Sequence, residues 1–430
     1  MVEGQTALDD VRTDKKMKFI TAKTLYLLFG ILITLGMLGP LPAIGEEIAL
    51  DRALELFYRN NYDIIIHRYE VDKAEGDFVG AKLLPNPTFS LNYTGMNTGL
   101  NAGDNTQMTF RLDQLIELGG KRGFRIQSAT ETWEAAKLSH QEAIRNLLIG
   151  FYTNYFNLLL NELNIEFATE ELKRYNRLHE VSTKRHESGF LSFLEYTKHR
   201  LARIELENNL LQLKNQNRND LETFNLLLGG QGSFKPLKEL AKEEFPEITE
   251  KTLLETAYVN RYDFLALQRQ IKSAEFNQKL ARAQRIPDIT LGGEYERFGV
   301  KGDPGLGAGV SLNIPLFSRG QGELIKRTAE VNQLKTLIEK TKKQIGTEIR
   351  QGINNYRSSQ AMFRNYKNRR EDMHTLLANS EKAFSLGGIT VLELLDTNKT
   401  YKDFMTKYNQ TLIQTVLNKA LLKIYSGELK

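Results

Sequence analysis

The feature that most constrains the fold is a repeat of about 200 residues. When the sequence is shifted by 200 positions, the segment that begins near position 50 falls on the segment that begins near position 250. The identical pairs are Leu54/Leu254, Glu55/Glu255, Tyr58/Tyr258, Asn60/Asn260, Tyr62/Tyr262, Asp63/Asp263, Ala74/Ala274, Glu75/Glu275, Pro87/Pro287 and Leu91/Leu291. A shift of 198 aligns a later motif, Gly189 with Gly387 and Glu195 with Glu393. A period this long indicates duplication of a large unit and not a solenoid of short repeats.

The repeat divides the chain into two halves with one plan. We predict a first structural repeat at 46–230, a second at 250–430, and an inter-repeat linker or equatorial region at 231–249. Each half opens with one helical pattern, at 49–82 and at 250–284, which ends where prolines follow.

A long helix is predicted later in each half, from near Lys121 or Gly320 to the glycine motif. Each spans about 66 residues, or about 100 Å at 1.5 Å per residue, and a helix of about 40 residues returns. Such lengths are typical of coiled-coil packing. Apolar residues at heptad-like spacing support this; they are Ile144, Leu148, Phe151, Tyr155 and Leu158, then Ile338, Ile345, Ile349 and Tyr356. We assign these stripes to helix core.

A β-hairpin is predicted in each half, at 88–114 and at 288–315. Its strands read PTFSLNYT and QMTFRLDQ in the first half, PDITLGGEYE and GLGAGVSLNIP in the second. Apolar and polar residues alternate, so each strand has one apolar and one polar face. In an exported protein this pattern predicts a transmembrane β-barrel, with lipid outside, water inside and glycine-rich hairpin tips outside the cell. Four strands do not close a barrel, so partner copies are required. A hairpin lying on a soluble core is the alternative, but no other segment is patterned to cover it.

The N-terminus predicts export. Residues 1–45 read as a signal peptide, in which lysines precede an apolar run and Ala43 and Gly45 stand at positions −3 and −1 of a cleavage site. Met17 is an alternative start, and a retained membrane anchor is the alternative to cleavage. No later segment has about 18 uninterrupted apolar residues.

Composition excludes several classes of function. The chain has no cysteine, which excludes thiolate metal sites, disulfides, catalytic thiols and a lipid-modified N-terminal cysteine. Its net charge of +5 and its lack of a dense basic cluster give no case for a nucleic-acid partner. No nucleophile–base set, Walker loop or dinucleotide fingerprint is present. We therefore expect no enzyme and no cofactor, and energy must come from another protein.

Over essentially all of the mature sequence, the chain resembles the TolC-like outer membrane efflux proteins. The resemblance rests on the duplicated plan, on LLPNPTFSLNY and IPLFSRGQ at helix–strand junctions, and on SGFLSFLEYT and LGGITVLELLDT at the glycine motifs. It implies a mixed α+β membrane protein built as a homotrimer. A twelve-stranded β-barrel, four strands per protomer, would lie in the outer membrane and continue as a long coiled-coil α-helical barrel across the periplasm.

The stretch LIELGGKRGFRIQSA looks like the branch of this family that exports heavy-metal cations. The resemblance implies two protein partners, a periplasmic adaptor (membrane fusion) protein and an inner-membrane resistance-nodulation-division pump. Several relatives carry a lipid on an N-terminal cysteine. This chain has no cysteine, so its barrel alone would hold it in the outer membrane lipid.

By position, the resemblance places the glycine motifs at helical hairpin tips that meet the adaptor. The tip residues are Gly189, Leu191, Ser192, Gly387, Gly388, Ile389 and Thr390. Glycine permits the left-handed turn between antiparallel helices, and a hydroxyl residue can cap the restarting helix. The alternative is that these are turn residues without a partner.

Glu393 and Asp396 occupy positions where the family has acidic constriction residues. They lie three apart, hence on one helix face, and threefold symmetry would turn them into carboxylate rings that favour cations. The alternative is a solvated helix face, with Leu392 and Leu395 as packing positions. Ile389 replaces a basic gate residue of some relatives, so no salt-bridge lock is predicted. The first tip has Lys198 where the second has Asp396, so the constriction is placed on the second tip alone.

The histidines are His67, His140, His179, His186, His199 and His374. None forms a paired motif with a carboxylate at helical spacing, so no metal site is predicted. His179 and His186 are seven apart and could share a face near the tip. A contact with metal in transit and an exposed surface histidine are both open, and we expect exposure.

The sequence thus predicts a passive outer membrane channel, the exit duct of a tripartite efflux system for heavy-metal cations. The alternatives are an outlet for drugs or for type I protein secretion and, in a different class, a periplasmic coiled-coil tether. A tether has no use for four amphipathic strands.

Overall fold

The protein is described from a computed structural model, which covers residues 46–95, 106–230, 232–238, 245–299 and 302–428. From Glu47 onward these residues form one compact unit. The predicted signal peptide and most of the first hairpin tip lie outside the described residues. Within them, every helix is too short or too polar to cross a membrane.

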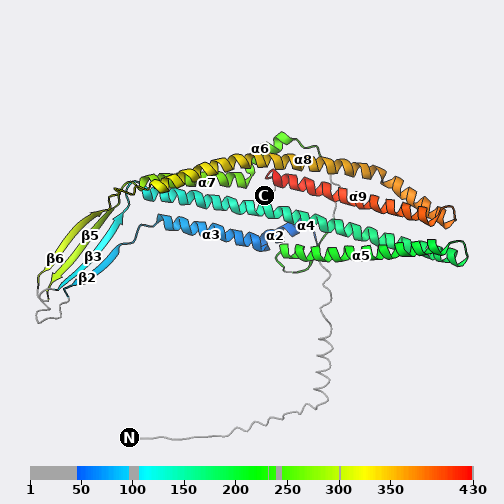
Figure 1. The fold of residues 1–430 in the computed structure, drawn as a ribbon, viewed down its shortest axis with the longest axis horizontal. Helices are drawn as coiled ribbons and strands as arrows, with labels where there is room; N and C mark the ends of the chain where they lie inside the picture. Colours follow the sequence, from blue (N-terminus) through cyan, green and yellow to red (C-terminus); the bar gives the residue numbers. More distant parts are fainter. Residues whose placement is uncertain (1–45, 96–105, 231, 239–244, 300–301, 429–430) are drawn as a thin grey trace, which may run out of the picture. The chain divides into compact units, whose positions relative to one another are not determined.

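The two halves have the same order of elements (Figure 1). The first half contains α2 (Leu50–Asn60), α3 (Tyr62–Lys82), β2 (Thr88–Thr94), β3 (Gln107–Ile116), α4 (Lys121–Glu187) and α5 (Phe193–Leu227). The second contains α6 (Glu250–Asn260), α7 (Tyr262–Ala283), β5 (Ile289–Phe298), β6 (Pro304–Leu312), α8 (Gln321–Ser385) and α9 (Val391–Tyr425). The long helices have 67 and 65 residues, which confirms the predicted length.

The first helix of each half is interrupted, so the prediction of one continuous helix was wrong in both halves. Asn61 and Arg261 have extended backbone angles, with ψ of 123° and 122°. The Asn61 side chain caps α3 by accepting from Asp63 N and Ile64 N. Arg261 has no such cap and pairs with Asp263 and Glu348 at 2.7 and 2.5 Å. The break is therefore repeated, although the polar contacts that hold it differ.

The four predicted strands form one antiparallel sheet in the order β2-β3-β5-β6. One transverse row of partners is Ser90, Arg111, Glu294 and Gly307, so polar residues share a face. The next row is Leu91, Phe110, Tyr295 and Leu306, which lie on the other face. The predicted alternation is confirmed, and the two hairpins join through β3 and β5.

Near the strands, α3 packs on α4, α4 on α7, and α7 on α8. Along the part of the long helices that is farther from the strands, α5 packs on α4 and α9 packs on α8 (Figure 1). The stripe on α4 is confirmed, since Leu148, Phe151, Tyr155 and Leu158 are buried. Ile345, Ile349 and Tyr356 are buried on α8 likewise.

Two short strands were missed in the sequence. They are β1 (Glu46–Ile48) and β4 (Phe234–Pro236), which pair with each other. The Ile48 carbonyl accepts from the N–H of Leu237 at 2.8 Å. Three-residue strands are too short to show an alternating pattern, so part of the linker has structure that periodicity does not reveal.

Candidate functional site

The two glycine motifs form matching turns between antiparallel helices. Gly189 and Gly387 have φ of 77° and 80°, the left-handed region that glycine adopts without strain. In the first turn Phe190 N donates to Arg185 O at 2.8 Å, and in the second Gly388 N donates to Ala383 O at 2.8 Å. Together with a second bond one residue earlier, this is a Schellman motif at each helix end. The predicted turns are confirmed.

Each returning helix begins with a capping box. Ser192 Oγ accepts from Glu195 N at 3.2 Å, and Glu195 Oε2 accepts from Ser192 N at 3.2 Å. Thr390 and Glu393 repeat this arrangement at 3.3 and 2.8 Å. These bonds satisfy N–H groups at the helix start. The hydroxyl–glutamate spacing shared by the two tips therefore has a structural role at both.

The tips pack together through one apolar cluster of buried side chains. Its members are Leu178, Leu191, Phe384, Val391 and Leu394, and the partly buried Val181, Tyr196, Ile389 and Leu395 pack against them. They come from the hairpins α4–α5 and α8–α9, which are distant in sequence. The two tips of one protomer thus form a single packed unit.

Arginines of α4 reinforce that contact. Arg185 Nη1 donates to the carbonyl oxygen of Phe384 at 2.6 Å, and its guanidinium lies 5.0 Å from the Phe384 ring centre. Further from the tip along α4, Arg174 pairs with Glu381 at 2.7 Å and donates to Asn398 Oδ1 at 3.2 Å. Charged contacts of low exposure therefore link the first hairpin to both helices of the second.

The predicted tip residues fall into two groups. Gly189, Ser192, Gly387, Gly388 and Thr390 are exposed. Leu191 is buried and Ile389 half-buried, both in the apolar cluster. A partner protein that approached the tips could therefore contact the backbone turns and hydroxyls, but it would not reach the Leu191 side chain.

Large apolar side chains at the tips were not singled out from the sequence. Phe190, Phe193 and Leu386 are 78%, 72% and 78% exposed, and Leu194 and Leu392 are exposed as well. The packing role that the solvated-face alternative gave to Leu392 is wrong, because Val391 and Leu394 are the buried residues of that turn. The sequence offered a signal in the apolar pair that follows each cap, Phe193-Leu194 and Val391-Leu392, although Val391 of the second pair is buried.

Glu393 and Asp396 are both exposed on α9. The carboxylate of Glu393 accepts from the N–H and the hydroxyl of Thr390 at 2.8 and 2.9 Å, and these bonds lower its pKa. Glu393 is thus charged and turned back onto the cap, while Asp396 lies one turn further along the helix. Among the described residues, no three His, Asp or Glu side chains are placed to hold a metal ion.

The chain matches the family described as "Outer membrane efflux protein" over residues 57–230 and 253–425. The chain belongs to the outer membrane efflux protein family. This confirms the resemblance drawn from the motifs.

Relatives in the outer membrane efflux protein family extend over most of the chain. It is 22% identical over 388 residues to the cobalt-zinc-cadmium resistance protein CzcC of Cupriavidus metallidurans, covering 86% of this chain and 87% of that protein. It is 22% identical over 404 residues to the pyoverdine export outer membrane protein OpmQ of Pseudomonas putida, covering 88% and 85%. The crystal structure of CusC superposes with a TM-score of 0.76 at 15% identity, covering 90% of this chain and 97% of that one. The shared fold is that of TolC-type outer membrane channels.

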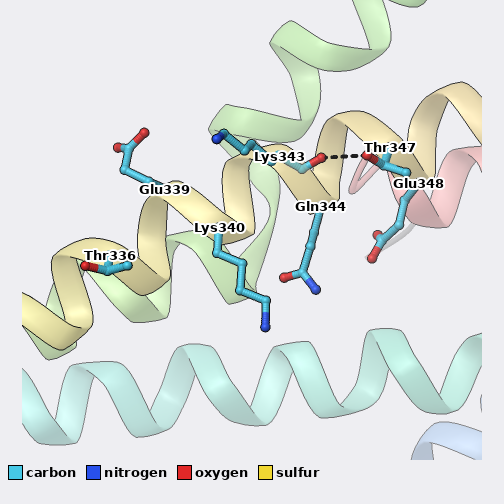
Figure 2. Close-up of a pocket in the computed structure, with 7 residues that line it drawn as sticks. All are labelled: Thr336, Glu339, Lys340, Lys343, Gln344, Thr347 and Glu348. Atoms are coloured by element: carbon cyan, nitrogen blue, oxygen red, sulfur yellow. Dashed lines mark hydrogen bonds between the residues drawn. The ribbon is translucent and has the colours of Figure 1, made fainter.

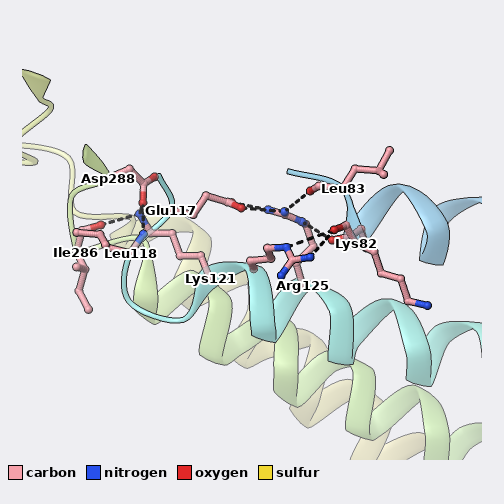
Figure 3. Close-up of polar contacts among 10 residues, drawn as sticks. Lys82, Leu83, Glu117, Leu118, Lys121, Arg125, Ile286 and Asp288 are labelled. Carbon is pink, nitrogen blue, oxygen red and sulfur yellow. Dashed lines mark hydrogen bonds and ion pairs between the residues drawn. The ribbon is translucent and has the colours of Figure 1, made fainter. Parts of the chain in front are cut away.

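In this outer membrane efflux protein, the stretch LIELGGKRGFRIQSA builds the joint between strands and helices (Figure 3). Lys121 is buried, and its Nζ donates to Ile286 O at 2.6 Å and to Asp288 Oδ1 at 2.8 Å. Arg125 donates to both carboxylate oxygens of Glu117 at 2.5 and 2.9 Å and to Ala81 O at 3.2 Å. These bonds tie the start of α4 to the ends of α3 and α7, so the motif has a structural role of its own.

A surface hollow of about 580 Å³ lies along the middle of α8 (Figure 2). It is lined by Thr336, Glu339, Lys340, Lys343, Gln344, Thr347 and Glu348. Lys340 and Gln344 point toward α4, while Glu339 points away from it (Figure 2). The acidic and basic side chains that line the hollow all come from one helix and do not point toward a common centre. We therefore do not assign the functional site to this hollow.

Proposed function

We propose that three copies of this chain form a passive exit duct of a tripartite efflux system. In this proposal the strands of three protomers make a twelve-stranded barrel in the outer membrane. The helices continue it as an α-helical barrel through the periplasm. Residues 46–230 and 250–430 act as two structural repeats around the 231–249 equatorial region, and 1–45 is a signal peptide that directs export.

The observation that carries the proposal is the shared lateral order of strands and helices. The sheet has β2 and β6 at its open edges. The helices near it follow the same order, with α3 and α8 outermost, since α3 packs on α4, α4 on α7 and α7 on α8. Both layers therefore leave the same two sides of the protomer unpaired. Head-to-tail addition of copies would pair β6 with β2 and α8 with α3, and such an arrangement can close as a ring.

The two faces of the sheet fit lipid on one side and water on the other. One face exposes Phe89, Leu91, Tyr93, Leu112, Leu291, Tyr295, Leu306, Val310 and Leu312. On the opposite face Arg111 pairs with Asp113 at 2.8 Å and with Glu294 at 3.2 Å. A closed barrel with the first face outward would satisfy both environments.

We assign adaptor contact to the exposed residues of the tips. Gly189, Ser192, Gly387, Gly388 and Thr390 stay in this assignment, and Ile389 contributes its exposed part. Leu191 supports the turn from inside the cluster. The apolar side chains of Phe190, Phe193 and Leu386 add contact area that a helical hairpin of the adaptor would bury.

The cargo we propose is a heavy-metal cation, delivered by a resistance-nodulation-division pump. Support comes from the name of CzcC, the cobalt-zinc-cadmium resistance protein. The name of OpmQ supports a second candidate, export of an organic molecule such as a siderophore or drug. The identity of the neighbouring genes would distinguish the two cargoes, because genes for a metal-type pump and adaptor would favour export of cations.

A direct test uses the full chain expressed in a Gram-negative host. We expect it in the outer membrane fraction, with heat-modifiable migration, three copies by native mass spectrometry in detergent, and single-channel conductance in planar bilayers. A soluble periplasmic chain would instead establish the tether alternative. A monomer without conductance would refute the duct.

The constriction is tested separately. As the pore constriction, Glu393 and Asp396 would form rings of carboxylates, so Glu393→Ala with Asp396→Ala should raise conductance or reduce block by multivalent cations. Glu195→Ala is the matched control, because it removes a capping box from the first tip without touching the proposed ring. Unchanged conductance and block in the double variant would refute the assignment.

A further inference from the structure

His199 lies fully buried where the two hairpins meet, contrary to the expected surface exposure of the tip histidines. Its ring stacks on Tyr175 of α4 with centroids 4.4 Å apart and on His179 at 5.6 Å. It also lies parallel to the ring of Phe384 on α8, at 6.3 Å and 5°. The imidazole of α5 is therefore part of the contact between the first hairpin and the second.

Both ring nitrogens of His199 lack a hydrogen-bond partner among the described residues. An imidazole buried without a partner avoids a charge, and burial lowers the pKa of His199 to about 4. His179 contributes to this lowered pKa, and the pKa of His179 is itself lowered by burial and by Arg203 and Arg200. Burial therefore disfavours a positive charge on either imidazole.

The helices α4, α8 and α9 all contribute side chains to the contact that buries His199. On α4, Arg185 lies over the Phe384 ring, which is parallel to the His199 ring. From α8 comes Glu381, which is already paired with Arg174 at 2.7 Å. The α9 members of the cluster, Val391 and Leu394, are apolar. Within the described chain, no carboxylate is recorded as a partner of the His199 ring.

We infer that His199 is a proton-sensitive latch between the hairpins α4–α5 and α8–α9, and that protonating it separates the two tips. A charged imidazole would be stabilised by reaching water, and moving α5 away from Phe384 would uncover the ring on that side. The step from separated tips to a wider periplasmic entrance rests on the proposed function.

The size of the effect follows from proton linkage. The open form has an ordinary histidine that binds a proton below about pH 6.5, whereas the closed form resists it down to about pH 4. The closed form, with the two tips packed together, is therefore favoured at neutral pH. Its free-energy advantage over the open form, with the tips separated, decreases as the pH falls from about 6.5 to about 4. From this histidine alone, the ratio of open to closed form should rise about 60-fold between pH 7 and pH 4.5.

Two carboxyls at the same contact act in the opposite direction. Burial raises the pKa of Glu171 and of Glu381. Both therefore take up protons more readily in the closed form, and acid favours closure through them. Removing the imidazole should consequently abolish acid opening and leave the weak reverse trend.

The chain has no cysteine, so single spin labels can be placed at Glu187→Cys on α4 and Lys382→Cys on α8. Electron–electron distances are measured on the full chain in lipid nanodiscs at pH 7, 5.5 and 4.5. The labelled protein is diluted with unlabelled protein so that distances arise within one protomer. We expect a longer-distance population that grows as the pH falls.

His199→Phe retains the stacked ring without a titrating group and should keep the short distance at every pH. His199→Gln serves the same purpose if the phenylalanine variant does not fold. His67→Gln removes an exposed histidine of α3 and should respond to acid as the parent does. A short distance at pH 4.5 in the parent, or acid opening that persists in both His199 variants, would overturn the inference. Absence of conductance at any pH would instead count against the duct and leave the distance result intact.

Discussion

The tip between α4 and α5 and the tip between α8 and α9 turn with the same backbone hydrogen bonds and restart with the same capping box. Their side chains differ at positions on either side of the turn and the cap. His186 of the first tip corresponds to Phe384 of the second, and half-exposed Tyr196 corresponds to fully buried Leu394. One backbone design thus carries different side chains, and at these two pairs of positions the second tip is the more deeply buried.

This difference shows which parts of a duplicated tip are free to diverge. A left-handed residue and a capping pair are fixed by backbone geometry, which is identical in the two copies. Side-chain packing is not fixed in this way, because the two tips contribute different residues to one buried cluster, Leu178 and Leu191 from the first and Phe384, Val391 and Leu394 from the second. We therefore expect equal costs for equivalent backbone substitutions and unequal costs for equivalent packing substitutions.

The largest asymmetry is expected at the pair Phe384 and His186. Phe384 is fully buried, contacts the His199 ring and lies under Arg185. Phe384→Ala should lower the stability of the tips by about 3–5 kcal/mol, since it leaves a cavity. His186→Ala removes a half-buried ring and should cost about 1 kcal/mol. Hydrogen exchange of the tip amides measures both losses of stability. Equal losses would show that the two tips do not differ in packing at this pair.

Symmetry should return at the turn glycines. Gly189→Ala and Gly387→Ala each force an alanine to a φ near +80°, which should cost about 1–2 kcal/mol in either tip. Gly388→Ala is the matched control, because its φ is not positive and an added Cβ would meet Ala383 O at 3.5 Å, an ordinary contact. It should change stability by less than about 0.5 kcal/mol. Thermal unfolding in detergent would reveal any difference between the tips.

The elements of this fold were accessible from the sequence because their periods are long and regular. The α4 stripe from Leu148 to Leu158 and the alternating strands were predicted and are present. The breaks at Asn61 and Arg261 were not foreseen, since neither residue is a helix breaker in itself. Asn61 acts there as a cap, and Arg261 is held by carboxylates of which one, Glu348, is 87 residues away.

The tip chemistry was predictable only where it is local. Glycine turns and hydroxyl caps involve residues within a few positions, so the motif reveals them. The burial of His199 depends on Phe384, which comes from the other half of the chain. Likewise the link from Arg185 to Phe384 O joins residues 199 positions apart. Such contacts need the packed tips and leave no pattern in a single segment.

Equal effects are also expected at the caps. Ser192→Ala and Thr390→Ala each remove a hydroxyl that accepts from the backbone of the third helical residue, and each should cost about 1 kcal/mol. Because its bonds to Thr390 lower the pKa of Glu393, that box is intact above the ordinary carboxyl pKa. It should weaken as the pH falls through the lowered value. Exchange of the first α9 amides as a function of pH would show this.

Lys198 of the first tip corresponds to Asp396 of the second. Substitutions at this pair should change stability least and should differ most clearly in their effect on conduction. Lys198 and Asp396 are both exposed, so exchanging their charges should change stability by less than about 0.5 kcal/mol. If the second tip lines the narrow passage, Asp396→Lys would reverse the sign of one charge in each of three copies. The reversal potential in a KCl gradient should then move away from cation preference. Lys198→Asp should move it less, because the first tip lies outside the proposed ring. Equal shifts for the two variants would mean that both tips face the pore, and the division of roles between them would have to be abandoned.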